Sequence, residues 1–249
     1  SLLPETPPGW DGYRIHAFSR SAREVGGDFY DFVRIDENRL MVVVADASGK
    51  GIPACMLMGM CQSFVRSSVQ RYRGLETFLR ELNQYLFQDT DRAHFVTVAV
   101  CVIDRKNHVC DYARAGHTEL LVRLSDRQTR TICPDGPALG LLPEDVGVHF
   151  DTLSFSFREG TSLMLFTDGI TETLNEEETE FGLERLEQVW QRQSLPPEDM
   201  AQTVLGEVGE FQGDVPQADD QTIVIVSRPT GETDSSDRTD TADDSTANG

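Results

Sequence analysis

Apolar residues in this chain gather in short runs, and several of these runs alternate apolar with polar positions between glycine, asparagine and aspartate boundaries. Runs of this length and pattern predict β-strands. We therefore expect strands over residues 13–19, 28–35, 39–47, 94–104, 108–116, 118–125, 129–134, 148–157, 161–169 and 221–227. The connections "DENR" and "RKN" have the composition of tight turns, which predicts that the strands beside each of them pair as β-hairpins.

Three segments have a helical pattern instead. Residues 53–72 form the first, and its opening half, "ACMLMGMC", is apolar on every side, so we expect it to be buried between layers. The second spans residues 76–87, with apolar side chains at i, i+4 and i+8. The third runs over residues 181–212 and is broken at Pro196 and Pro197.

The order of these elements indicates the fold class. Strands come first, followed by two helices, many strands, another helical block and a final strand. This clustering is typical of an α+β architecture in which helices flank antiparallel sheets. Residues 1–228 contain no internal repeat and no linker, which predicts one domain. Residues 229–249 contain six acids, one arginine and no aliphatic side chain larger than alanine, so we expect a disordered acidic tail.

Composition narrows the partners and the location. The 249 residues carry a formal net charge of −20, which argues against nucleic acid as a partner, because phosphate contacts need a basic surface. The five cysteines form no C-x-x-C pair, so neither a disulfide framework nor a zinc site is expected. No stretch approaches the ~20 apolar residues of a membrane span, and we expect no signal peptide. These features indicate a cytoplasmic protein.

A longer parent protein is compatible with the same features. The chain begins at Ser1 without methionine, so we expect that a sensor or regulatory domain upstream is absent from this chain. A membrane-tethered full-length protein that holds this domain inside the cell is an alternative to a purely cytoplasmic one.

Four acidic positions differ from the remaining acids, because each lies at the end of an apolar strand or in a glycine turn. They are Asp28 in "VGGDFYD", Asp46 in "VVVADASGKG", Asp168 in "LMLFTDGITE", and the pair Asp219–Asp220 in "ADDQTIVIV". Turn chemistry alone explains any one of them, since aspartate readily bonds nearby backbone N–H groups. Strand ends at one rim of a sandwich would instead bring the carboxylates together. Such a cluster repels itself unless cations are bound, and its hard oxygen ligands suit Mg²⁺ or Mn²⁺.

Six motifs in the sequence resemble those of a known protein family. The segments "AREVGGDFYDF", "VVVADASGKGIPA", "YARAGHTELLV", "GPALGL", "LMLFTDGITET" and "DDQTIVIV" occur in the order expected of a PPM-type metal-dependent Ser/Thr protein phosphatase. The chain most resembles the bacterial SpoIIE/RsbU-like branch over residues 2–227. The resemblance implies an α-β-β-α fold, in which helices flank an antiparallel β-sandwich with a binuclear metal centre at one rim.

The same resemblance implies a role for each acid. Two divalent cations, Mn²⁺ or Mg²⁺, would share Asp46 as a bridging ligand, and the backbone carbonyl of Ala47 would join one of them. Asp168 and Asp219 would complete the shell of the first cation, and Asp28 would hold the second directly or through water. A water between the cations would attack phosphorus in line.

Neighbouring residues qualify the match. Asp219 is preferred over Asp220, because the first position of that motif is the ligand in the family. Arg23 has the spacing at which relatives carry a phosphate-gripping arginine, and a surface role is the alternative. Ser48 stands where eukaryotic relatives have a histidine that protonates the leaving group, so a metal-bound water is expected to replace it. His117 in "AGHTE" is interpreted as a structural turn residue in preference to an acid.

The resemblance implies a protein phosphatase that acts on phosphoserine or phosphothreonine of a regulatory protein, of the anti-sigma-factor antagonist type. The alternative is a catalytically weak or inactive module of the same fold that binds a phosphoprotein. The helices of the region 53–88 act in relatives as a switch and can mediate a homodimer, whereas a plain buried core is the other interpretation of this region.

Overall fold

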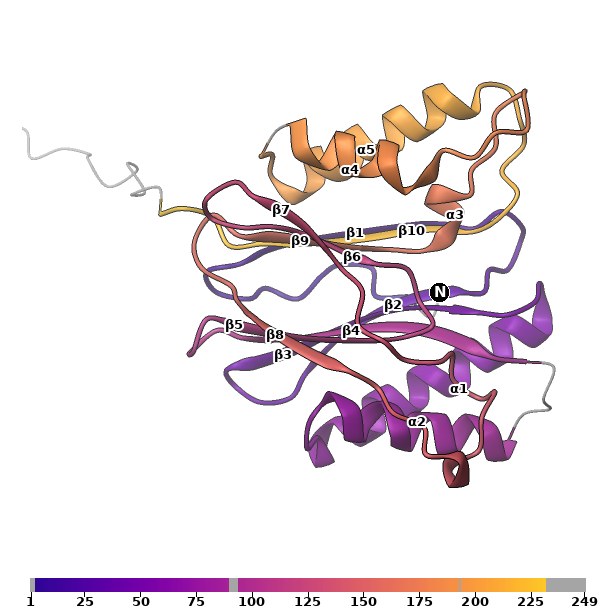
Figure 1. Ribbon diagram of the computed structural model, residues 1–249, viewed down its shortest axis with the longest axis vertical. Helices are drawn as coiled ribbons and strands as arrows, with labels where there is room; N and C mark the ends of the chain where they lie inside the picture. The colour runs from indigo at the N-terminus through magenta and orange to yellow at the C-terminus, as the bar shows by residue number, and fades with distance from the viewer. Residues whose placement is uncertain (1–2, 90–93, 193, 232–249) are drawn as a thin grey trace, which may run out of the picture.

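The computed structural model describes residues 3–89, 94–192 and 194–231, and it has four layers (Figure 1). Ten strands in this part of the chain form two five-stranded sheets in which every neighbouring pair is antiparallel. The first sheet has the order β1 (Arg14–Arg20), β10 (Gln221–Ser227), β9 (Ser162–Phe166), β6 (Leu120–Arg123) and β7 (Thr129–Ile132). The second has the order β2 (Asp28–Arg34), β3 (Arg39–Ala47), β4 (Val96–Asp104), β5 (Val109–Ala115) and β8 (Thr152–Ser156).

Helices cover the outer face of each sheet. The second sheet carries α1 (Ile52–Ser68), which a 3₁₀ turn continues over Val69–Arg71, and α2 (Leu75–Asp89). The first sheet carries α4 (Gly182–Arg192) and α5 (Pro197–Gln212). A short helix, α3 (Asp168–Thr171), follows β9, and a 3₁₀ turn spans Glu144–Val146. The predicted α-β-β-α sandwich is thus confirmed, as is the break of the third helical block at Pro196–Pro197.

Strand β3 shows why its sequence lacks alternation. Leu40, Val42 and Val44 point between the two sheets, whereas Met41 and Val43 point toward α1 and α2. Successive side chains of a strand face opposite sides, so a strand covered on both faces must be apolar at every position. The run "LMVVVA" therefore identifies a central strand of a sandwich that is covered by helices.

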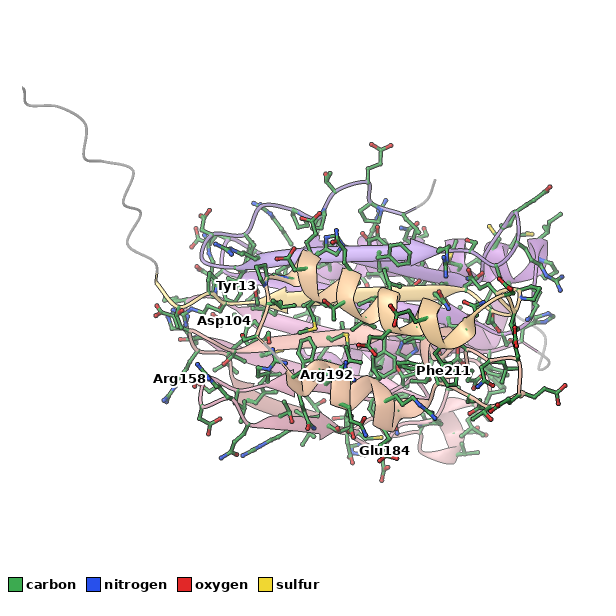
Figure 2. The ribbon with its side chains drawn as sticks, turned by 90° about the horizontal axis from the view of Figure 1, so that it is seen from above. Tyr13, Asp104, Arg158, Glu184, Arg192 and Phe211 are labelled. Atoms are coloured by element: carbon green, nitrogen blue, oxygen red, sulfur yellow. The ribbon has the colours of Figure 1, made fainter. Side chains whose placement is uncertain are left out.

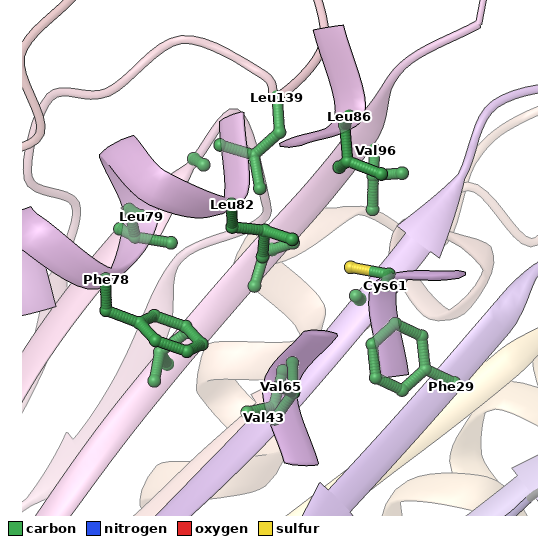
Figure 3. Close-up of a cluster of buried hydrophobic side chains, with 14 of the residues drawn as sticks. Phe29, Val43, Cys61, Val65, Phe78, Leu79, Leu82, Leu86, Val96 and Leu139 are labelled. Carbon is green, nitrogen blue, oxygen red and sulfur yellow. The ribbon is translucent and has the colours of Figure 1, made fainter. Parts of the chain in front are cut away.

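The helix side of the second sheet is filled by α2 and α1 (Figure 3). Phe78, Leu82 and Leu86 of α2 are almost completely buried, which matches the i, i+4, i+8 spacing in the sequence. Cys61 and Val65 of α1 are fully buried in the same cluster. The predicted second helix is confirmed with its buried face.

The prediction that "ACMLMGMC", the opening half of the helix expected over residues 53–72, is buried between layers is wrong. The helix α1 ends at Ser68 and lies in the outermost layer, so only one of its faces has a sheet to pack on. Ile52 is 71 % exposed and Met56 is 66 % exposed on its first turns. The all-round apolar pattern therefore reflects an apolar surface beside the buried face.

Three predicted strands are shorter in the structure than in the sequence pattern. The strand expected over 161–169 ends at Phe166, and the residues after it turn into α3. The strands expected over 148–157 and 118–125 shrink to Thr152–Ser156 and Leu120–Arg123.

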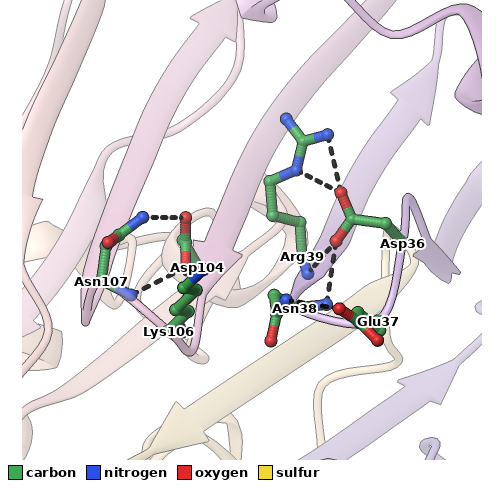
Figure 4. A network of polar contacts seen from close by, with 7 residues as sticks. All are labelled: Asp36, Glu37, Asn38, Arg39, Asp104, Lys106 and Asn107. Atoms are coloured by element: carbon green, nitrogen blue, oxygen red, sulfur yellow. Dashed lines mark hydrogen bonds and ion pairs between the residues drawn. The ribbon is translucent and has the colours of Figure 1, made fainter.

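The two predicted hairpin turns lie at the ends of β2–β3 and β4–β5 (Figure 4). The carboxylate of Asp36 accepts the backbone N–H groups of Asn38 and Arg39, both at 2.8 Å. The carboxylate of Asp104 accepts the N–H groups of Lys106 and Asn107 in the same way, both at 2.9 Å. These aspartates act in turns alone, which shows that turn chemistry accounts for some acids at strand ends.

On the other outer face, α4 and α5 pack together on the first sheet, and Figure 2 shows Arg192 and Phe211 on these helices. Arg192 of α4 donates a hydrogen bond to Glu207 of α5, and Phe211 packs edge-on against Phe181. No helix in residues 3–89, 94–192 and 194–231 is long and apolar enough to cross a membrane. The tail expected over 229–249 lies outside the described residues from position 232 onward.

Candidate metal centre

The hairpin β2–β3 brings two of the predicted acids together. Asp28 opens β2, Asp46 lies one residue before the end of β3, and the two are direct cross-strand partners. Both lie on the strand face whose other members, such as Tyr30 and Val44, point between the sheets. Residues directly opposite on one face have Cβ atoms about 4.5–5.5 Å apart. The two carboxylates therefore meet at the rim of the sandwich.

Thr167 joins this hairpin to the other sheet. Its hydroxyl is fully buried and donates a hydrogen bond to Oδ2 of Asp28 at 2.7 Å. The hydroxyl oxygen of Thr167 in turn accepts the backbone N–H of Thr222, in β10, at 3.0 Å. The Asp28 carboxylate is thus held in one orientation by a contact that crosses the sandwich.

Asp168 and Asp219 approach the same rim from the first sheet. Asp168 begins α3 just after β9, and Asp219 lies just before β10, and these two strands are antiparallel neighbours. Asp168 is half-buried and Asp219 is exposed. Asp219 lines a shallow depression together with Asp46, Arg23 and Lys50. The structure therefore gathers all four predicted acids at one end of the sandwich.

The neighbouring Asp220 has a structural role instead. It is 8 % exposed. Its carboxylate accepts three backbone N–H groups, those of Ala22 at 2.8 Å, Gly27 at 2.6 Å and Asp28 at 3.4 Å. A Cβ atom on Gly26 would lie 2.4 Å from Oδ2 of Asp220, so glycine is required at this approach. Asp220 therefore anchors the loop before β2, while Asp219 remains the member of the pair that faces the depression more openly.

The rim carries a strong electrostatic cost. Burial raises the pKa of Asp28 to about 7, and the neighbouring carboxylates add to this rise. Burial, followed by the charge of Asp28, raises the pKa of Asp46 to about 8. Burial and the charge of Asp219 also raise the pKa of Asp168. Carboxyl groups that hold protons near neutral pH would release them when a cation binds, because the cation offsets the repulsion between the carboxylates.

The residues present fit divalent cations in donor chemistry and charge. Carboxylate and carbonyl oxygens are the ligands of Mg²⁺ and Mn²⁺, and Asp46 is followed by the buried Ala47, whose carbonyl lies close to Gly27. No three acid, histidine or cysteine side chains within the described ranges are already arranged as ligands of one ion. The Nζ of Lys50 lies 3.5 Å from Oδ2 of Asp219, so this lysine partly offsets the charge of that carboxylate.

Arg23 lies on the exposed loop between β1 and β2. It lines the same depression as Asp46 and Asp219. The structure thus brings the predicted phosphate-binding arginine to the mouth of the site, at a surface position from which it can also face water.

Ser48 and His117 both have structural contacts. The Ser48 hydroxyl accepts the backbone N–H of Phe95 at 2.8 Å, and its own N–H donates to the Phe95 carbonyl at 2.9 Å. The Nδ1 atom of His117 lies 2.8 Å from the Thr97 hydroxyl, and burial lowers the pKa of His117 to about 3. A neutral, buried imidazole has no proton to give a leaving group at neutral pH. The structural interpretation of His117 is therefore supported.

Two residues of the site do not stand out in the sequence. Thr167 shares a strand face with Leu163 and Leu165, so strict alternation through "LMLFTD" would have placed its hydroxyl between the sheets. Lys50 is the basic residue of the "SGKG" turn, and its position four residues after Asp46 in the chain was the available signal. Both were hidden because their partners, Asp28 and Asp219, lie far away in the sequence.

Comparison with known proteins gives the family. Residues 36–229 match the family model described as Stage II sporulation protein E (SpoIIE). The chain is 27 % identical over 256 residues to Protein IcfG of Synechocystis sp., covering 92 % of this chain and 40 % of that protein. It is 29 % identical over 177 residues to phosphoserine phosphatase RsbU of Bacillus subtilis, covering 71 % of this chain and 52 % of that protein. The chain thus spans about half the length, or less, of these relatives.

Solved structures agree on the architecture. The SiaA-PP2C domain of Pseudomonas aeruginosa superimposes with a TM-score of 0.76 at 20 % identity, covering 85 % of this chain and 84 % of that one. The PP2C phosphatase domain of SpoIIE from Bacillus subtilis gives a TM-score of 0.75 at 18 % identity, covering 86 % and 63 %. The fold is that of a PP2C phosphatase domain, and because the family model spans most of the sequence, the chain belongs to the SpoIIE family.

Proposed function

We propose that this chain is a metal-dependent protein phosphatase that hydrolyses phosphoserine or phosphothreonine on a regulatory protein. The observation that carries the proposal is the group Asp28, Asp46, Asp168 and Asp219 at one rim of a PP2C sandwich, in which the first three have raised pKa values. Two relatives, RsbU and RsbP of Bacillus subtilis, are named phosphoserine phosphatases, which supports the reaction class.

In the proposed site, two divalent cations, Mn²⁺ or Mg²⁺, are held by the predicted ligands. Asp46 would serve both cations, the Ala47 carbonyl, Asp168 and Asp219 would hold the first, and Asp28 would hold the second directly or through water. When bound, the cations supply the charge that activates a water for in-line attack on phosphorus.

The chain's own residues prepare this site. Thr167 fixes the Asp28 carboxylate, so that little reorganisation is needed when a ligand binds. The guanidinium of Arg23 suits the planar, bidentate recognition of a phosphoryl group at the mouth. Ser48 is already committed to the Phe95 backbone, and His117 is neutral, so the leaving-group proton comes from water.

A protein substrate agrees with the shape of the site. The depression that Asp46 and Asp219 line is shallow and does not enclose a small molecule. We propose a phosphorylated protein of the anti-sigma-factor antagonist type, which would present its phosphoryl group on a protein surface. A cytoplasmic location is part of the proposal, and it agrees with five cysteines that are all free.

The test is phosphate release from a phosphorylated antagonist-type protein in Mn²⁺. EDTA should abolish release, and Asp168→Asn should reduce it by on the order of 100-fold or more, because it removes a charged ligand without changing shape. Asp214→Asn removes an exposed acid that lies outside the depression and serves as the matched control. Release that persists in both EDTA and Asp168→Asn would contradict the binuclear mechanism.

The second candidate function is a binding module that captures a phosphoprotein without turnover. Its supporting observation is that the acids are not yet arranged around one ion and that Lys50 contacts Asp219. Binding of the phosphorylated protein with no release at any Mn²⁺ concentration would favour this module.

Region 53–88 is proposed to carry a homodimer contact or a switch that an upstream regulatory domain controls. Met56, on the second turn of α1, is 66 % exposed. The start of α1 follows the turn after Asp46 directly, so a shift of this helix would move the proposed bridging ligand.

A further inference from the structure

A row of arginine and serine residues crosses the first sheet at the strand ends opposite those that lead into α3. Figure 1 shows α3 at the other end of the sandwich. Arg14 of β1 lies opposite Ser227 of β10, and Ser227 lies opposite Ser162 of β9. Ser162 in turn lies opposite Arg123 of β6. These four residues, the arginine row, cross four neighbouring strands in one register.

The arginine row lies on the helix-covered face of the first sheet. Leu121 and Ile225, two positions before Arg123 and Ser227, pack beneath α4 and α5. Side chains two positions apart point to the same face, so the row belongs to that face as well. It ends the apolar layer beneath the helices, at the connection from α4 to α5.

The arginine row lines an open cavity of about 1140 Å³. Arg127 and Arg228 add two further guanidinium groups to its wall. Arg228 has an acid within reach, because its Nη2 lies 3.7 Å from Glu159. A cavity with four arginines is unexpected in a chain that has 22 basic residues and a net charge of −20. Its positive potential favours anions.

Arg123 is the feature that points to a ligand. The residue is only 3 % exposed, and its Nη2 has no hydrogen-bond partner among the described residues. The guanidinium lies over the ring of Trp190, 4.8 Å from its centre, which covers one face but satisfies no N–H donor. Burying a guanidinium without a hydrogen-bonding anion is strongly unfavourable. An oxyanion is the group that matches its fork of donors.

We propose that this cavity is an oxyanion-binding site in which the buried guanidinium of Arg123 binds a phosphate or carboxylate group, assisted by Arg14 and the serine hydroxyls of the arginine row. The site is separate from the acidic rim and does not depend on the proposed phosphatase activity. The oxyanion has two possible sources, a diffusible phosphate compound or the carboxylates that begin at Glu232. The second source follows Pro229 and Gly231 in the sequence, and these two residues themselves line the cavity.

Trp190 provides a local probe, since the chain has only two tryptophans. In a Trp10→Phe background, inorganic phosphate is titrated in EDTA at constant ionic strength, with chloride as the reference anion. EDTA removes cations that would bind phosphate at the acidic rim. We expect a saturable change in Trp190 fluorescence.

Two variants of the full chain distinguish binding in the cavity from a general effect of salt. For each variant we measure how far phosphate raises the melting temperature. Arg123→Met should weaken phosphate binding at least about tenfold, as expected for loss of a charge-assisted contact. Arg130→Met removes an exposed arginine of β7 that lies outside the cavity, and it should leave the rise unchanged.

A chain that ends at Gly231 keeps every described helix and strand, and it distinguishes the sources. Equal phosphate affinity in the full and shortened chains would identify a diffusible ligand. Binding that is at least tenfold tighter in the shortened chain would identify the acidic segment as the native occupant. The proposal is overturned if phosphate gives neither response in either chain, or if Arg123→Met and Arg130→Met respond alike.

Discussion

Replacing Asp46 by asparagine should stabilise the cation-free protein at pH 8, although it removes a proposed metal ligand. Asp28 and Asp46 are direct cross-strand partners on one face, so their Cβ atoms are about 5 Å apart. Two unit charges at that separation repel each other by about 3 kcal/mol at an effective dielectric constant of 20. Asparagine keeps the shape of the side chain and removes one charge. We expect the free energy of unfolding in EDTA to rise by about 2 kcal/mol, since partial protonation already relieves some repulsion.

The direction of the pKa shifts decides how the stability of the cation-free protein changes with pH. Folding raises the pKa of Asp28 from 3.8 to about 7, and that of Asp46 from 3.8 to about 8. A carboxyl group with a raised pKa binds more protons in the folded state, so its contribution to stability is full below about pH 4 and is lost as the pH rises through 7 to 8. In EDTA, the unfolding free energy of the wild type should therefore fall between pH 5 and pH 8. The fall should be smaller in Asp46→Asn, which keeps the contribution of Asp28, because burial is the main cause of that pKa shift.

Urea denaturation in EDTA at pH 5 and pH 8 measures both effects. Asp214→Asn, which removes an exposed acid, should follow the wild type and so corrects for the general charge of −20. Saturating Mn²⁺ at pH 8 should reverse the order, because only the wild type keeps the full set of ligands. The reasoning fails if the wild type is equally stable at both pH values in EDTA, or if Asp46→Asn is the less stable protein there at pH 8.

Three further changes test the packing around the site. Gly169→Ala would place a Cβ atom 1.8 Å from the backbone oxygen of Asp220, so α3 must shift. We expect the free energy of unfolding, measured in urea, to fall by about 2 kcal/mol, and phosphate release to be lost. Wild-type values for both would contradict the contact. Arg66→Ala leaves the buried carboxylate of Asp31 without its partner at 2.6 Å and should cost about 2 kcal/mol; a double-mutant cycle with Asp31→Asn should show coupling, not additivity. Met56→Asp should halve the mass measured by light scattering if α1 carries the dimer contact, and an unchanged mass at every concentration would exclude that contact.

The fold was largely predictable because its strands have two kinds of apolar pattern. The run at residues 40–45 is apolar throughout and marks a strand covered on both faces, which is what β3 proved to be. The same reasoning failed for the opening half of the helix expected over residues 53–72, because an apolar pattern does not show how many layers pack against a helix. In a four-layer sandwich the outer helix has one covered face, and Ile52 and Met56 remain exposed on it. The strand expected over 161–169 ended early because α3 is set by contact with the residues before β10.

The positions of the acids in the site could be predicted from the sequence. Which acids form the site and which act only in turns could not be predicted from the strand pattern alone. Side-chain alternation places Asp28, Asp46 and Thr167 on the inner face, and the antiparallel order of strands brings them to one rim. Turn chemistry at Asp36 and Asp104 shows that an acid beside a strand has no role in the site by itself. What distinguishes the two groups is whether several acids share one rim, and that depends on strand order, which the sequence leaves open.

The pair Asp219–Asp220 shows where sequence reasoning must stop. Both acids precede β10, and the family resemblance alone, not a local pattern of residues, gave the preference for Asp219. The register in which Arg20 pairs with Gln221 carries the chain leaving β1 past the start of β10. The backbone N–H groups of that loop then need an acceptor, and the inward-facing Asp220 supplies it at 2.6 and 2.8 Å. Asp219 is the one left exposed toward the depression, so a pairing between the first and last strands decides which carboxylate is available to a ligand.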